Sequence, residues 1–172
     1  MTATVLVRAG EELTISYLPA GRGSVTRRST IRELWHFTCC CRRCGDPTEL
    51  GSHASTVLCR WVPVQCSAAV LLDRQCGGLV LALQPADLDS DYGCGDCGAV
   101  VSRATMLALV NTLQDQVKAT PRTDLAMLGR LMEALARILH PQHFLLLELK
   151  QRWVDAAMGQ LDKQLETLEK VS

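Results

Sequence analysis

The chain has 172 residues, 48% hydrophobic and only 4% aromatic, and its 18 basic and 18 acidic residues give a formal net charge of zero. This length suits one domain, or a small domain with a helical extension, and the apolar content excludes wholesale disorder. A neutral chain has no general electrostatic attraction to nucleic acid or to an anionic membrane, so we expect neither as a partner.

The cysteine content indicates metal rather than disulfides. The N-terminal apolar run is too short for a signal peptide, and no stretch of about 18 apolar residues occurs. We therefore expect an intracellular protein, of the cytoplasm, the nucleus or both. Disulfides are rare in such reducing compartments, where an odd number of cysteines, nine here, is typical of metal ligands and free thiols.

The first zone, residues 1–37, predicts a strand pair followed by a helix. A turn at Ala9–Gly10 separates two β-rich runs, Thr4–Val7 and Leu13–Tyr17. The glycines between Pro19 and Ser24 predict a loop. Ser29 or Thr30 is then expected to cap a short helix that runs through Trp35.

The second zone, residues 38–102, opens with a C-x-C-x2-C arrangement. Its cysteines are Cys39, Cys41 and Cys44. A spacing of two places a pair of thiolates on one tight turn, within reach of a tetrahedral Zn²⁺. Three ligands leave a fourth position open to water, His36, His53, Cys40 or Cys66, although Cys40 should point away from its neighbours on an extended strand. The alternative is a chance cluster of buried free thiols.

A second cluster ends this zone with Cys-Gly-Asp-Cys, typical of a zinc knuckle. Upstream, Cys59-Arg60 and Gln75-Cys76 would form a matching Cys-Arg-Gln-Cys knuckle if residues 61–74 were removed, so we interpret that stretch as an insertion and leave Cys66 as a spare. A redox pair is the weaker alternative, because no βαβ pattern surrounds it. We therefore group four cysteines as ligands: Cys59, Cys76, Cys94 and Cys97.

The third zone, residues 103–172, lacks cysteine and is strongly periodic. Apolar stripes predict helices over Met106–Val117, Leu125–Leu139 and Phe144–Met158. Gly159 is expected to separate a fourth helix, whose leucines span too few heptads for a coiled coil. Short connections between these segments favour an antiparallel arrangement.

Gly10–Tyr17, with its Gly-Glu-Glu stretch, resembles the last strand of a SET domain, and Arg32–Cys44 resembles a post-SET zinc segment. Together these segments resemble the SET-and-MYND (SMYD) family of SET-domain protein-lysine methyltransferases, in its arthropod SmydA-like branch. Asp46–Gly51, Gly77–Leu81 and the tetratricopeptide-like helix junction at His140–Phe144 continue the likeness, which covers nearly the whole chain outside 61–74. The resemblance implies an α+β fold: a C-terminal SET β-hairpin, a cysteine-rich post-SET region and an antiparallel helical tail.

The resemblance also implies methyl transfer from S-adenosylmethionine to a lysine of a protein such as a histone. Tyr17 would line the lysine channel and orient the amine, and Phe37 would pack against the cofactor's adenine; otherwise they are an ordinary strand tyrosine and a core residue. In the family, a glycine-rich cofactor motif and an Asn-His-Ser-Cys type segment lie before the Gly-Glu-Glu strand, but only ten residues precede Glu11 here. We therefore expect both segments to be absent, together with the fourth ligand of the first zinc and the MYND module. The chain is then expected to be an inactive fragment. The alternatives are a non-catalytic zinc-plus-helix interaction module, and a partner that binds the full-length enzyme's clients.

Overall fold

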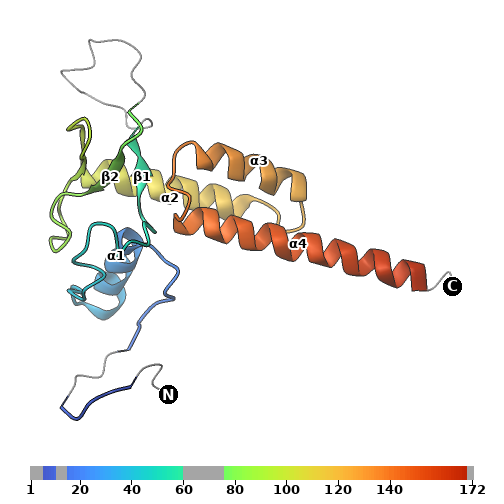
Figure 1. Ribbon diagram of the computed structural model, residues 1–172, viewed down its shortest axis with the longest axis horizontal. Helices are drawn as coiled ribbons and strands as arrows, with labels where there is room; N and C mark the ends of the chain where they lie inside the picture. The colour runs from blue at the N-terminus through green and yellow to red at the C-terminus, as the bar shows by residue number, and fades with distance from the viewer. Residues whose placement is uncertain (1–5, 11–14, 60–75, 170–172) are drawn as a thin grey trace.

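The structure is a computed structural model that describes residues 6–10, 15–59 and 76–169. Within these residues the chain forms four helices and one four-stranded antiparallel sheet, so the fold class is α+β, as expected. The longest helix, α4, runs out past the ends of α2 and α3 toward the C-terminus (Figure 1). No helix of the described part has the length and apolar character needed to cross a membrane.

The described part of the predicted N-terminal hairpin contains no strand. Thr4, Val5 and residues 11–14 lie outside the described residues, and Leu6, Val7 and Ile15–Tyr17 belong to no strand. Ala9 and Gly10 do form the expected turn. Leu6 and Ile15 are exposed, and an isolated two-stranded hairpin with no packed face is only marginally stable in water.

Helix α1 spans Ser24–Trp35, so the prediction that it begins at Ser29 or Thr30 is wrong. Its N-cap, Gly23, has no side chain to accept a hydrogen bond. Two distant side chains accept instead: the Ser24 N–H donates to Glu49 Oε2 (3.0 Å), and the Val25 N–H donates to Ser55 Oγ (3.3 Å). The helix therefore begins where the tertiary fold supplies acceptors, which local sequence does not reveal.

A small sheet in the cysteine-rich zone was not predicted. Its strands run in the order β1 (Val57–Leu58), β2 (Leu79–Ala82), β3 (Tyr92–Cys94) and β4 (Val100–Val101). With two to four residues each, these strands are too short to show an alternating pattern. Leu58 pairs with Leu79, so the two flanks of the proposed insertion lie on neighbouring antiparallel strands. Residues 61–74 themselves lie outside the described residues.

Three helices follow the sheet: α2 (Arg103–Ala119), α3 (Leu125–Ala136) and α4 (Phe144–Glu169). Ser102 and Asp124 cap the first two through hydrogen bonds to the N–H groups of Thr105 and Met127. The expected break at Gly159 is wrong, because α4 continues through it. One glycine costs a helix about 1 kcal/mol, which the helix-forming residues around it offset.

The sheet and the helices share one hydrophobic core, to which β1–β4, α1, α2, α3 and α4 all contribute. Backbone hydrogen bonds also join the residues around β1 to the α3–α4 connection. Leu58 donates to the Ile138 carbonyl (2.7 Å), His140 to that of Thr56 (3.1 Å) and Phe144 to that of Ala54 (3.0 Å). The cysteine-rich sheet is thus built against the helical tail.

Candidate metal centres and aromatic cluster

Four cysteine sulfurs converge at one end of the sheet. Cys59 follows β1, Cys76 precedes β2, Cys94 ends β3 and Cys97 lies in the next turn. All four Sγ atoms lie within 4.8 Å of one another, with Cys59–Cys97 at 3.4 Å and Cys76–Cys94 at 3.7 Å. A tetrahedron with Zn–S bonds of ~2.3 Å has edges of ~3.8 Å. The structure therefore brings together the four cysteines grouped from the sequence, in a geometry that could hold zinc.

Two glycines permit this convergence. Gly98 has a φ of +71° and donates its N–H to the Cys94 carbonyl (3.0 Å), which closes the turn between the last two cysteines. At Gly78, a Cβ atom would lie only 2.6 Å from Cys94 Sγ and 2.7 Å from Asp96 Oδ2. Only a residue without a side chain lets β2 approach the cluster this closely.

The environments of the four sulfurs differ. Burial, followed by the neighbouring Cys97 sulfur, raises the pKa of the Cys59 thiol well above its usual range. The Ala99 N–H holds the pKa of the exposed Cys97 thiol below that range. A bound divalent cation would favour the thiolate form throughout, because metal ligands bind without their protons.

The first cluster contains only three sulfurs. Cys39, Cys41 and Cys44 lie within 4.8 Å of one another, and burial raises the pKa of Cys44 to about 12. Among the described residues, no further cysteine, histidine or carboxylate joins them; this set includes the suggested His36, His53 and Cys40, whereas Cys66 lies outside it. The three thiolates suit zinc but leave its tetrahedral shell incomplete.

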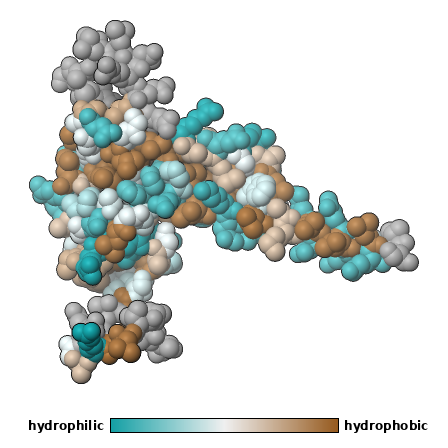
Figure 2. Space-filling model, viewed as in Figure 1, coloured by the Kyte–Doolittle hydropathy of each residue, from teal (hydrophilic) through white to brown (hydrophobic). Residues whose placement is uncertain are grey.

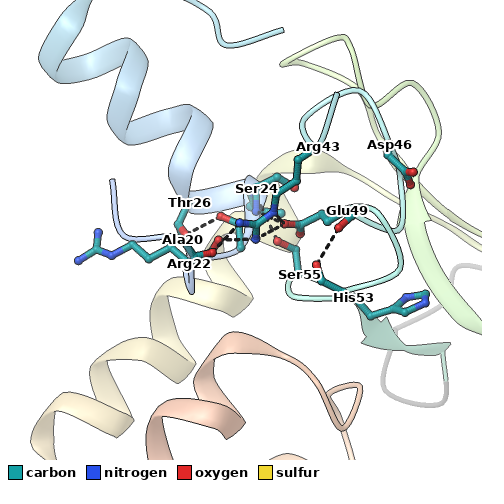
Figure 3. A network of polar contacts seen from close by, with 12 residues as sticks. Ala20, Arg22, Ser24, Thr26, Arg43, Asp46, Glu49, His53 and Ser55 are labelled. Carbon is teal, nitrogen blue, oxygen red and sulfur yellow. Dashed lines mark hydrogen bonds and ion pairs between the residues drawn. The ribbon is translucent and has the colours of Figure 1, made fainter. Parts of the chain in front are cut away.

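Arg43, between the last two cysteines of this cluster, holds the loop in place (Figure 3). Its guanidinium donates to Glu49 Oε2 from Nη2 (2.7 Å) and Nε (3.0 Å), and to the carbonyls of Ala20 (2.5 Å) and Arg22 (2.8 Å). Glu49 is 3% exposed and also accepts from Ser24 at the start of α1. The pair thereby joins the thiolate loop to α1. The sequence analysis missed it, because a spacing of six residues carries no local signal.

Three aromatic rings meet just before this cluster. The Tyr17 centroid lies 5.1 Å from that of Phe37 and 5.4 Å from that of Trp35, both at 65° in edge-to-face geometry. The structure thus brings together the two residues to which the resemblance gives catalytic and cofactor roles. Trp35 was overlooked, although its place two residues before Phe37 was a usable signal. The three side chains are 38–44% exposed.

Three histidines gather where the sheet meets the tail, and the sequence analysis gave them no such role. His53 and His140 lie with ring centroids 4.5 Å apart, and His143 is fully buried. Burial lowers the pKa of His143 to about 3. Its Nδ1 accepts the Leu145 N–H at 3.2 Å, so the neutral ring carries its proton on Nε2.

Comparison with known proteins finds similar sequences. No protein-family model matches the chain. Isoform B of the Drosophila melanogaster SET domain-containing protein SmydA-8 is 29% identical over 152 residues, which cover 86% of this chain and 31% of that protein. Isoform A is 28% identical over 145 residues, covering 82% and 28%. The chain is thus similar in sequence to these SmydA-8 proteins over most of its own length.

The SmydA relationship confirms the resemblance found in the sequence. The chain spans about a third of the length of the curated proteins that it matches. Their names imply a SET domain, and the described residues show a small sheet, four helices and two cysteine clusters that could hold zinc.

Proposed function

We propose that this chain is the zinc-binding and helical C-terminal part of a SmydA-like, S-adenosylmethionine-dependent protein-lysine methyltransferase, and that residues 1–172 alone do not transfer methyl groups. The observation that carries the proposal is the contact between the Tyr17 and Phe37 rings. Phe37 lies two residues before Cys39, the first ligand of the three-thiolate cluster. In the family that the chain resembles, these two positions serve the substrate lysine and the cofactor.

The proposed roles are positional. S-adenosylmethionine, when bound, supplies the methyl group. The Tyr17 phenol would orient the lysine amine, and Phe37 would present its ring to the adenine; such positioning is a major source of catalysis. Because Cys39 follows Phe37 by two residues, a zinc ion held by the three thiolates would fix the backbone that carries the Phe37 ring.

The proposed inactivity of the chain alone is argued from the exposure of the Tyr17 and Phe37 rings. Tyr17 is 44% and Phe37 38% exposed, whereas a methyl-transfer site has to exclude water around the reacting atoms. The first cluster also lacks a fourth ligand among the described residues. We infer that another segment of a SET domain would cover the rings and complete the zinc shell. Protein substrates, histones among them, and a cytoplasmic or nuclear location belong to this proposal.

A chimera tests the proposal. Residues 1–172 replace the matching third of the Drosophila relative, and S-adenosylmethionine binding is measured by calorimetry alongside transfer to histones and mixed proteins. We expect no binding by the chain alone, binding by the chimera, and a loss of transfer when Tyr17→Phe is introduced. Turnover by residues 1–172 that Tyr17→Phe abolishes would refute the inactivity. A folded chimera without cofactor affinity would refute the methyltransferase assignment.

The second candidate function is a non-catalytic interaction module held together by zinc. One observation favours it: the C-terminal half of α4 stands clear of the body and presents apolar side chains to solvent (Figure 2). That observation does not require a methyltransferase.

A further inference from the structure

Helix α4 leaves the body of the molecule over its last three turns. Every residue from Met158 to Glu169 is exposed, and the helix projects beyond its neighbours (Figure 1). An isolated helix of this length is marginal in water, and Gly159 weakens it further. The projecting segment would therefore gain stability from a partner.

The projecting segment carries an apolar stripe with heptad spacing. Val154, Met158, Leu161 and Leu165 follow one another at intervals of four, three and four, so they share one face of the helix. Their side chains are 44–60% exposed. Brown apolar atoms follow the projecting helix between teal polar ones (Figure 2). Such a face fits the seam of a second helix.

The two edges of the stripe differ in charge. Asp155 follows Val154 and Asp162 follows Leu161 by one residue each, so both carboxylates lie along the same edge of the stripe. The opposite edge carries Ala157 and Gln164, which are neutral. In helix pairs, residues at these flanking positions select the partner through ion pairs.

We propose that the stripe binds an amphipathic helix of another protein whose apolar seam is flanked by lysine or arginine. Basic flanks would lie against the acidic edge and form ion pairs across the seam. A second copy fits less well: antiparallel copies would bring two acidic edges together, and parallel copies would set the acidic edge against Ala157 and Gln164. An anionic membrane would be repelled by the same carboxylates.

Two synthetic peptides of about four heptads test the proposal on the full chain. Both carry leucine at the seam; one has lysine and the other glutamate at the flanking positions, so like charges prevent either from pairing with itself. Fluorescence anisotropy of the labelled peptides measures binding. We expect the lysine peptide to bind at least about tenfold more tightly, and to weaken between about 0.05 M and 1 M salt as screening increases.

Variants of exposed residues test whether the peptide binds to the stripe. Leu161→Glu should weaken binding of the lysine peptide by about tenfold or more, because it places a charge in the middle of the apolar stripe. Gln160→Glu adds the same charge one residue away, off the stripe, and should leave binding unchanged. Replacing Asp155 and Asp162 together by lysine should reverse the preference between the two peptides.

Four results would overturn the proposal: equal affinity for both peptides, no binding of either, binding to anionic vesicles, or a dimer in solution that Leu161→Glu dissociates. None of these readouts involves methyl transfer, so they are independent of the proposed enzymatic role.

Discussion

The two cysteine clusters use the same ligand atom but differ in how the fold completes them. The cluster at the sheet draws its sulfurs from residues around β1, β2 and β3, and all four lie within 4.8 Å of one another. The first cluster draws three sulfurs from the six residues Cys39–Cys44, and the ion pair of Arg43 with the buried Glu49 holds its loop. A sheet gathers distant ligands, whereas one short loop supplies too few to close a tetrahedron.

The largest effect should come from removing metal. Binding free energy for structural zinc in small modules is about 10 kcal/mol or more at neutral pH, and it contributes directly to folding. A strong chelator should therefore unfold the β1–β4 sheet while most of the helical circular dichroism remains, because residues 103–172 contain no cysteine. Added zinc should restore the sheet. Complete loss of helical signal would show that the tail depends on the metal.

The ion pair of the first cluster should come next. Glu49→Gln leaves the partly exposed Arg43 guanidinium without its countercharge and weakens the acceptor at the start of α1, so we expect a loss of about 3 kcal/mol in unfolding free energy, the lower end of the range for buried pairs. Denaturant titration measures it. The matched control is Asp115→Asn, which breaks the exposed Lys118 pair (3.3 Å) and should cost less than about 1 kcal/mol. Equal effects would mean that the Arg43–Glu49 pair does not hold the loop.

A glycine substitution probes the sheet cluster alone. Gly78→Ala places a methyl group 2.6 Å from Cys94 Sγ, which forces a ligand to move and should cost about 1–3 kcal/mol as well as lowering zinc affinity. Gly95→Ala, in the same knuckle, meets nothing within 4 Å and serves as the control. Competition with a chromophoric chelator measures both. If the two alanines behave alike, the close approach of β2 to the cluster is not needed for binding.

The smallest effect at neutral pH concerns the histidine between the sheet and the tail, because it develops only as the pH falls. His143 has a pKa of about 3 in the folded chain against about 6.5 when unfolded. Its neutral form therefore stabilises the fold fully above pH ~6.5, and this stability is lost as the pH falls toward 3, by about 1.4 kcal/mol per pH unit. His143→Gln should reduce the slope of unfolding free energy between these values. An unchanged slope would contradict the burial of a neutral ring.

Thiol spacing allowed both cysteine clusters to be predicted from the sequence, because a knuckle and a C-x-C-x2-C segment are local. The pairing of Cys59 with Cys76 required an inferred insertion, yet the neighbouring strands β1 and β2 do bring these two residues together. The periodic stripes gave three of the helices for a similar reason: burial of one face repeats along the chain.

The features that sequence reasoning missed depend on distant contacts. The start of α1 requires Glu49 and Ser55 as acceptors, and the Arg43–Glu49 pair is completed by Ala20 and Arg22. The strands are too short for a period of two, and Gly159 lies in a helix where a break was expected. In each case tertiary contacts or helix-forming neighbours outweighed the local signal.

Zinc stoichiometry in single cysteine variants tests the difference between the clusters most directly. The purified chain, washed with a weak chelator, should retain about one zinc ion, held by the closed four-thiolate site. Cys94→Ser should release that ion, whereas Cys41→Ser should leave it bound, as measured by elemental analysis against protein concentration. Retention of zinc by Cys94→Ser together with its loss from Cys41→Ser would show that the stable site is the three-sulfur loop, and would contradict the account.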